Sequence, residues 1–321
     1  MESTTTKPQI SYDMSPYLLQ YTDGTIDRLA GSERVPPGFD PRTSVTSKDI
    51  TITPGIPARI YTPTTTSTTN HKLPLVLYFH GGAFVIASPA FPLYHDFCNS
   101  LVSSADVIVV SVDYKLAPEH PLPAAYDDAW AAAQWAAAHA EGDGPEEWLN
   151  DGVDFKRIFL AGDSAGSTLA HHISCRVNGS CFDERVCIEG MILIHPYFWG
   201  TDPIGSETHD PRKQMVDRWW SYVCPSDKGC DDPLINPFTD GAPGVEKIVC
   251  SRMIVLVAEK DILSERGKYY YEKVRKSGWK GKTEYFVTEG KDHVFHIFEP
   301  DCEKALEMKR KIASFINQET D

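Results

Sequence analysis

The stretch FLAGDSAGST, residues 159–168, decides the fold of this chain. An apolar run ends at Gly162, and Ser164 and Gly166 follow at alternate positions, which gives the pattern Gly-x-Ser-x-Gly. A serine nucleophile on a sharp strand-to-helix turn has this pattern, because small flanking residues let the backbone turn. Composition alone would supply the pattern in about one chain in ten, so its meaning depends on the surrounding sequence.

Short apolar runs alternate with helix-forming stretches through most of the chain. The runs are apolar on both faces, which is typical of strands buried in a parallel sheet. They span residues 73–79, 106–114, 157–162, 190–198 and 252–259. Helices are expected over residues 123–140, 164–177, 265–278 and 301–316. An earlier strand pair, residues 49–63, turns at Pro54-Gly55. This alternation predicts an α/β fold with a mostly parallel, doubly wound sheet.

Two segments interrupt the alternation. Residues 1–45 are polar and contain an Asp-Gly hairpin signal within residues 21–29. Residues 198–250 are rich in Pro, Gly, Asp and aromatic residues, and they are long for a connecting loop. We expect this insertion to fold over the carboxyl edge of the sheet, with the N-terminal segment joining it as a lid. Residues 1–321 are then expected to form a single domain.

The charge and the cysteines exclude several classes of protein. The formal net charge of −14 disfavours nucleic acid and anionic membranes as partners. The N-terminal residues lack the apolar region of a signal peptide, and no apolar run approaches the roughly 20 residues of a membrane span, so we expect a cytoplasmic protein. Eight cysteines without metal-binding spacing are expected to be mostly buried, reduced thiols, and no metal site is expected. The glycosylation pattern Asn178-Gly179-Ser180 is expected to be idle.

A second turn lies upstream of the serine. His80-Gly81-Gly82-Ala83 follows the expected strand 73–79 directly. Adjacent glycines allow the backbone to present its N–H groups without interfering side chains. An oxyanion hole needs such donors, each typically worth about 2.7–4 kcal/mol of barrier. The N–H of Ala165, at the start of the next helix, is a further candidate.

The remaining catalytic groups should follow in the order acid, then base. Glu259 and Asp261 stand at the end of the expected strand 252–259, and both are candidates for the acid. His293 and His296 are the only histidines that follow, and both are candidates for the base. Two other histidines come after the serine and are expected only to pack in their helix: His171 and His172.

Five stretches resemble the α/β-hydrolases of the hormone-sensitive-lipase group, and more closely the plant carboxylesterases of that group. They are HGGAF (80–84), SVDYKLAPEHPLPAAYDDAW (111–130), GDSAGS (162–167), INPF (235–238) and GKDHVFHIF (290–298). The resemblance covers nearly the whole chain. It implies a serine carboxylesterase that hydrolyses small, partly apolar esters of specialised metabolism and needs no metal or organic cofactor. The chain departs from many relatives at Ala83, where they have a third glycine; its methyl group could narrow the acyl side of the pocket.

The resemblance also assigns catalytic roles. The family pattern Asp-x-Leu matches Asp261-Ile262-Leu263 and favours Asp261 over Glu259 as the acid. The stretch 290–298 implies His293 as the base and leaves His296 in the first turn of the last helix. His293 would accept the proton of the attacking serine, while the acid orients the imidazole. The expected oxyanion donors are the backbone N–H groups of Gly81, Gly82 and Ala165.

Relatives with other functions leave two alternatives open. Gibberellin receptors and certain alkaloid cyclases resemble this group but lack the catalytic histidine, whereas hydroxyisoflavanone dehydratases keep the acid and the histidine and tend to carry Thr as the nucleophile. Ser164 together with His293 favours an ester hydrolase. A base such as His293 could also drive an elimination, so a dehydratase and a receptor-like binding protein stay as alternatives.

The sequence gives a less specific prediction for the substrate pocket. Contacts with a small-molecule ester are expected from Ala83, Phe84, Asp163 and Val294. Aromatic residues that could line a pocket for a flavonoid, alkaloid or terpenoid ester are Phe84, Tyr94, Phe198, Trp199, Trp219, Trp220 and Phe295. Three charged residues are expected to form an ion network that braces the oxyanion loop: Asp113, Lys115 and Glu119.

Overall fold

The computed structural model describes residues 8–64, 72–177, 182 and 184–318. The possible glycosylation acceptor Asn178-Gly179-Ser180 and Cys181 lie outside the described residues. The seven described cysteines are free thiols, and five of them are buried, as expected. Among the described helices, none is long and apolar enough to cross a membrane.

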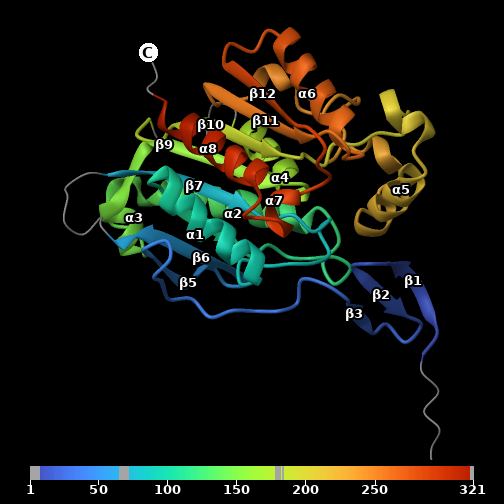
Figure 1. Ribbon diagram of the computed structural model, residues 1–321, viewed down its shortest axis with the longest axis horizontal. Helices are drawn as coiled ribbons and strands as arrows, with labels where there is room; N and C mark the ends of the chain where they lie inside the picture. Colours follow the sequence, from blue (N-terminus) through green and yellow to red (C-terminus); the bar gives the residue numbers. More distant parts are fainter. Residues whose placement is uncertain (1–7, 65–71, 178–181, 183, 319–321) are drawn as a thin grey trace, which may run out of the picture.

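A nine-stranded sheet forms the centre of the molecule (Figure 1). Its spatial order is β12-β11-β10-β9-β7-β8-β6-β5-β4. The six strands from β12 to β8 are parallel to their neighbours, and the three at the other edge pair antiparallel. The strands are β4 (Phe39–Asp40), β5 (Val45–Thr53), β6 (Ile56–Pro63), β7 (Leu73–Phe79), β8 (Ile108–Val112), β9 (Val153–Asp163), β10 (Ile188–Ile194), β11 (Arg252–Ala258) and β12 (Lys282–Thr288). This is the α/β sheet that the alternating pattern predicts.

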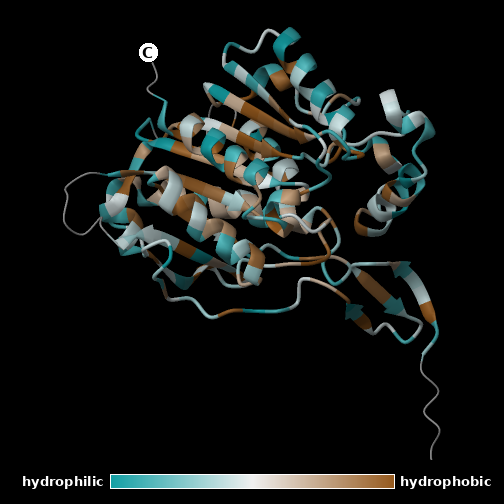
Figure 2. Ribbon diagram, in the orientation of Figure 1, coloured by the Kyte–Doolittle hydropathy of each residue, from teal (hydrophilic) through white to brown (hydrophobic). Residues whose placement is uncertain are grey.

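Helices cover both faces of the sheet, so the central strands are buried on both sides. Every residue of β7, β8, β10 and β11 is buried, which explains why these runs are apolar throughout. One face packs against α1 (Pro92–Ala105), α7 (Phe295–Phe298) and α8 (Glu303–Asn317). The other packs against α2 (Ala124–Ala138), α4 (Ala165–Arg176) and α6 (Ser264–Lys276). Figure 2 shows hydrophobic residues along the central strands and a mixture of hydrophilic and hydrophobic residues along the helices that cover them.

The predicted elements agree closely with the observed ones where the hydrophobic signal is continuous. The run 73–79 coincides with β7, and the helix expected over 301–316 is α8. The sequence reasoning missed α1 and β12. Strand β12 lies at the edge of the sheet and is only partly buried, so its sequence has no continuous apolar run.

The N-terminal segment and the insertion pack against each other. The predicted Asp-Gly hairpin is present as the last two strands of a small antiparallel sheet of β1 (Ile10–Met14), β2 (Leu18–Tyr21) and β3 (Ile26–Arg28). This sheet lies next to α5 (Arg212–Val223) of the insertion (Figure 1). The ring of Tyr12 stacks on that of Tyr222 at 4.1 Å, and the Tyr12 hydroxyl donates to the carbonyl oxygen of Arg218. We call β1–β3 and α5 together the cap.

A buried ion pair joins the insertion to the main body. Arg266 on α6 donates to both carboxylate oxygens of Glu207, each at 2.7 Å, and Glu207 is fully buried in the insertion. The same guanidinium donates to the carbonyl oxygen of Asp202 at 2.6 Å. Because the charges are paired in a bidentate arrangement, they hold the start of the insertion on the sheet without leaving an isolated buried charge.

Candidate active site

Ser164 occupies a sharp turn between β9 and α4. Its backbone has φ 51° and ψ −120°, a strained combination for a residue with a side chain. A Cβ at Gly166 would collide with the carbonyl oxygen of Phe79, and a Cβ at Gly162 would collide with the backbone of Gly166. The glycines of Gly-x-Ser-x-Gly are therefore required by close backbone approach, and the turn leaves the serine side chain at the carboxyl edge of the sheet.

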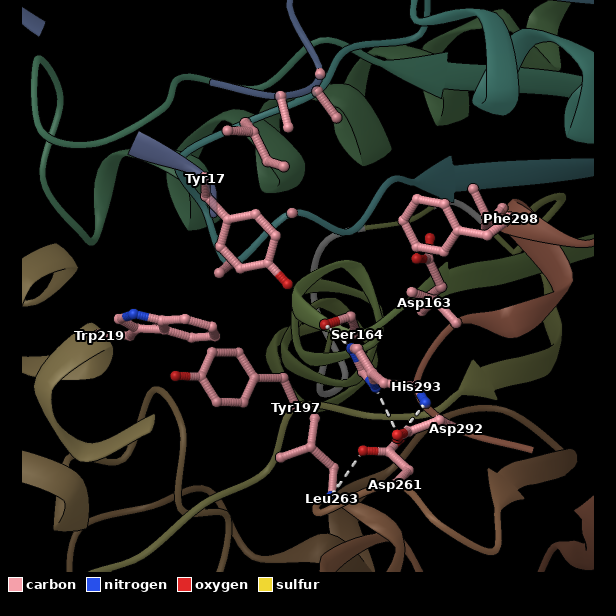
Figure 3. A pocket seen from close by; sticks show the side chains of 18 of the residues that line it. Tyr17, Asp163, Ser164, Tyr197, Trp219, Asp261, Leu263, Asp292, His293 and Phe298 are labelled. Atoms are coloured by element: carbon pink, nitrogen blue, oxygen red, sulfur yellow. Dashed lines mark hydrogen bonds and ion pairs between the residues drawn. The ribbon is translucent and has the colours of Figure 1, made fainter. Parts of the chain in front are cut away.

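The structure brings Ser164, His293 and Asp261 into one chain of hydrogen bonds (Figure 3). The Nε2 atom of His293 lies 2.9 Å from Ser164 Oγ, and its Nδ1 lies 2.7 Å from Asp261 Oδ2. The other oxygen of Asp261 accepts the backbone N–H of Leu263 at 2.9 Å. Each residue follows the carboxyl end of a strand: β9 for the serine, β11 for the aspartate and β12 for the histidine.

Mutual attraction fixes the charge states of the aspartate and the histidine. Burial raises the pKa of Asp261, but the charge of His293 and its hydrogen bond outweigh burial, so the pKa lies below its usual value. Burial lowers the pKa of His293, but the Asp261 carboxylate outweighs it, and the pKa lies above that of a free histidine. A negative charge held behind the imidazole makes the ring a better proton acceptor.

A second histidine supports the loop that carries His293. The N–H of Val294 donates to Nδ1 of His195 at 2.8 Å, and Val294 has a left-handed backbone, with φ 44°. His195 is buried, and burial together with the charge of His296 holds the pKa of His195 well below its usual value. The ring is therefore neutral and can accept this hydrogen bond. Sequence reasoning missed His195, because nothing in its local pattern distinguishes it from a packed histidine.

The oxyanion loop follows β7. Gly82 has φ +107°, and a Cβ there would collide with the carbonyl oxygen of Ile86. Gly81 donates its N–H inward, to Asp163 Oδ1 at 3.0 Å and to the Tyr94 hydroxyl at 2.9 Å. The expectation that Gly81 supplies an oxyanion donor therefore does not fit this geometry. The hydrogen bonds of the described residues leave three N–H groups near the serine without an acceptor: those of Gly82, Ala83 and Ala165.

Asp163 holds the oxyanion loop in place. It is fully buried, and beyond the Gly81 N–H it accepts the hydroxyl of Tyr78 at 2.6 Å and that of Tyr94 at 2.7 Å. Burial raises its pKa, while these hydrogen bonds act in the opposite direction. Asp163 reaches the cavity wall, but its oxygens are occupied by these donors, which identifies it as a support of the loop.

A cavity of about 430 Å³ opens above the serine. Two of the residues expected to contact the ester, Ala83 and Val294, line the cavity, whereas Phe84 does not: its φ of 64° turns the ring into a buried aromatic cluster. Of the seven aromatic residues considered from sequence, only Tyr94 and Trp219 reach the wall. The aromatic residues that the sequence reasoning missed are Tyr17, Phe91, Tyr197 and Phe298.

The alternative candidates lie outside the hydrogen-bonded chain. Glu259 accepts the N–H of Gly290 at 2.6 Å and is exposed. His296 is buried in α7, a short helix before α8, so its expected place in the last helix is wrong. His171 bonds the Tyr270 hydroxyl inside the core. The remaining histidine of the pair, His172, packs edge-on against the ring of Tyr126.

The expected ion network beside the oxyanion loop is wrong in its partners. Each of the three charged residues pairs elsewhere: Asp113 with Arg34, Lys115 with Asp128 and Glu119 with Arg28. Arg28, from the N-terminal sheet, also donates to the carbonyl oxygen of Val85 at 2.8 Å. The cap therefore contributes to bracing the segment that follows the oxyanion turn.

In the part of the chain that the structure describes, one group of side chains has the spacing of metal ligands. The ligand atoms of His195, Asp261 and His293 lie within 4.8 Å of one another. All three residues are already engaged: His293 bonds Ser164 and Asp261, Asp261 also accepts the N–H of Leu263, and His195 accepts that of Val294. The geometry fits proton transfer between Ser164 and His293, with Asp261 ionised behind the imidazole.

Comparisons with known proteins agree with this geometry. A family model described as alpha/beta hydrolase fold matches residues 76–297. The chain is 56% identical to probable carboxylesterase 2 of Arabidopsis thaliana, over 99% of both chains. It is 42% identical to 2-hydroxyisoflavanone dehydratase of Glycyrrhiza echinata, over 98% of both. A solved thermostable carboxylesterase cloned from a metagenomic library has a TM-score of 0.67 at 31% identity, covering 88% of this chain and 90% of that one.

A strand-to-helix serine in hydrogen-bond contact with a histidine and an aspartate, on a mostly parallel sheet, defines the class of α/β-hydrolases. The chain belongs to the alpha/beta hydrolase family, and within it to the plant carboxylesterases of the hormone-sensitive-lipase group. It is a carboxylic-ester hydrolase, as the resemblance in its sequence implies.

The contact between His195 and Val294 gives a testable consequence. Replacing His195→Leu removes the acceptor of the Val294 N–H, so His293 loses its fixed position, and kcat should fall by about tenfold. His195→Asn offers an amide oxygen near the position of Nδ1 and should recover most of that loss. The measurement is steady-state hydrolysis of p-nitrophenyl butyrate, and equal activity of the two variants would contradict a positioning role.

Proposed function

We propose that the protein is a serine carboxylesterase in which Ser164, His293 and Asp261 hydrolyse small, partly apolar esters through an acyl-enzyme. The observation that carries the proposal is the continuous hydrogen-bond chain, 2.9 Å from serine to histidine and 2.7 Å from histidine to aspartate. These three hydrogen-bonded residues line the cavity, where an ester carbonyl could approach the serine oxygen.

The reaction follows from these contacts. His293 Nε2 accepts the Ser164 proton as the oxygen attacks the ester carbonyl, and Asp261 stabilises the resulting imidazolium. The protonated histidine then gives its proton to the departing alcohol. Water attacks the acyl-enzyme by the same route and releases the carboxylic acid. The tetrahedral oxyanion accepts hydrogen bonds from the N–H groups of Gly82, Ala83 and Ala165.

The cavity wall supports an apolar substrate. Most of the side chains at the wall are aliphatic or aromatic. The cation among them, Arg212, is already paired: it lies 3.6 Å from Asp292 at the wall and bonds Asp210 outside the wall. The methyl group of Ala83 stands at the wall beside the oxyanion loop, where it limits the width available to the ester.

Elimination by a dehydratase is the second candidate. It is favoured by the 42% identity, over almost the whole chain, to a 2-hydroxyisoflavanone dehydratase. In such a reaction His293 would remove a carbon-bound proton from a substrate in the same cavity, and no attack by Ser164 would be needed. A variant without the Ser164 hydroxyl therefore distinguishes ester hydrolysis, which needs it, from elimination, which does not.

Replacing Ser164→Ala should lower kcat for p-nitrophenyl acetate and butyrate by at least about 10⁴-fold, because the nucleophile is lost. Ser221→Ala, which removes an exposed hydroxyl from the cap, is the matched control and should hydrolyse within twofold of the wild type. Undiminished ester hydrolysis by Ser164→Ala would refute the nucleophile. Dehydration of a 2-hydroxyisoflavanone that survives in this variant would favour the lyase.

The pH dependence should reflect the raised pKa of His293. The histidine must be neutral to accept a proton, so activity is lost as pH falls through its pKa. Because Asp261 raises that pKa, the acid limb of kcat/KM should have its midpoint above about 6.5, the ordinary histidine value. Asp261→Asn removes the negative charge and should move the midpoint to lower pH while reducing kcat. A wild-type midpoint well below 6.5, or an unchanged one in the variant, would contradict this account.

A further inference from the structure

The cavity extends to two sides of the nucleophile. Tyr17, Tyr197 and Trp219 lie on one side of Ser164, and Phe298 lies on the other (Figure 3). We call the first side the aromatic arm. Its three rings come from the β1–β2 turn, from the segment after β10 and from α5, so two of them belong to the cap. The reaction derived above gives no role to these rings.

The aromatic arm is fixed relative to the serine. The backbone N–H of Tyr197 donates to the carbonyl oxygen of Ser164 at 3.1 Å. The ring of Tyr17 packs on that of Trp219, with centroids 5.0 Å apart and planes tilted by 57°. Tyr197 is thus hydrogen-bonded to the backbone of the nucleophile, and the rings of Tyr17 and Trp219 pack against each other.

Tyr17 is held on both sides along the chain. Its N–H donates to the carbonyl oxygen of Met14 at 3.0 Å, and its own carbonyl accepts the N–H of Leu29 at 2.8 Å. The neighbouring side chains of Met14 and Leu18 are fully buried and anchor the turn. The direction of the Tyr17 side chain is therefore set before any substrate arrives.

The two tyrosine hydroxyls of the arm differ. The Tyr17 hydroxyl points toward Ser164, and none of the described residues is bonded to it (Figure 3). The Tyr197 hydroxyl, also without a partner among the described residues, is buried and points away from the serine, so this residue offers the cavity only its ring. Burial raises the pKa of Tyr17, and the charge of Asp261 raises it further, so the phenol keeps its proton and can donate it.

The residues of the aromatic arm and its adjoining wall favour a ligand that carries both a ring and a hydrogen-bond acceptor. The adjoining wall is apolar, with Met215, Val216, Ile262 and Leu263. A ring seated against aromatic residues gains from offset or edge-on contacts that an aliphatic chain cannot make. A ligand that covers the Tyr17 hydroxyl without offering an acceptor leaves a desolvated donor, which is unfavourable.

We propose that the aromatic arm binds a ring of the ester, and that the Tyr17 hydroxyl donates a hydrogen bond to an oxygen that the substrate carries between that ring and the scissile carbonyl. The preferred substrates are then oxygenated aromatic esters, with Tyr17 as the residue that selects the oxygen. The inference rests on the proposed ester hydrolysis and specifies the substrate class of the same site.

Two pairs of esters that differ only by oxygen in place of CH₂ test the proposal. Ethyl phenoxyacetate against ethyl 3-phenylpropanoate probes the acyl side, and 2-phenoxyethyl acetate against 3-phenylpropyl acetate probes the alcohol side. Acid release is followed in a pH-stat, with ethyl butyrate as the ester without a ring. Tyr17→Phe should lower kcat/KM for the oxygenated member of at least one pair by about fivefold and leave its partner within twofold. Trp219→Leu should lower kcat/KM for both esters of that pair by about fivefold relative to kcat/KM for ethyl butyrate.

Tyr222→Phe is the matched control, because it removes a hydroxyl from the same cap outside the cavity wall. It should keep the wild-type ratio within each pair. The proposal is overturned if Tyr17→Phe changes neither ratio, or if Tyr222→Phe changes the same ratio equally. Hydrolysis of ethyl butyrate by Ser164→Ala at the wild-type rate would instead overturn the proposed function, so the two failures are distinguishable.

Discussion

The strained backbone of Ser164 is the constraint on which the rest of the structure depends. A residue with φ 51° cannot continue a strand or begin a helix without help from its neighbours. Gly162 and Gly166 make this possible, because without a Cβ they let the backbones of β9, α4 and the end of β7 come into contact. That approach brings the oxyanion loop, which follows β7, next to the serine. A single local geometry therefore assembles the nucleophile and its electrostatic environment together.

Two buried aspartates hold different parts of the site in place: Asp163 holds the oxyanion loop, and Asp261 holds the catalytic histidine. Asp163 is surrounded by neutral donors, two tyrosine hydroxyls and the N–H of Gly81, and it fixes the loop. Asp261 faces His293 and fixes the base. The pKa is raised for Asp163 and lowered for Asp261, because burial dominates the first, whereas the second is in direct contact with a histidine that can carry a positive charge. Environment, more than residue type, gives each carboxyl group its role.

The sequence alone was sufficient for features whose cause is local. The apolar run of β7 and the glycines around Ser164 reflect burial and close backbone approach, which a short stretch records directly. The direction of a group was harder to predict. The inward N–H of Gly81 and the inward ring of Phe84 follow from the path of the oxyanion loop, which includes several residues at positive φ.

Contacts between segments that are distant in the chain could not be predicted from the sequence either. Tyr17 joins the cavity because the N-terminal sheet packs on α5, about two hundred positions further along the chain. No periodicity in either segment indicates which of their aromatic side chains meet. The two segments could be singled out from the sequence by their composition, whereas the residues that they contribute to the cavity could not.

The central claim is that Ser164 is the nucleophile of this site, and covalent labelling tests it most directly. A fluorophosphonate ester reacts with an activated serine and leaves a stable phosphonyl group on its oxygen. Intact-mass and peptide mass spectrometry of the inhibited enzyme should find one equivalent of label, on the peptide that contains Ser164. Complete inhibition with the label on another residue, or full activity after Ser164 has been labelled, would contradict the account.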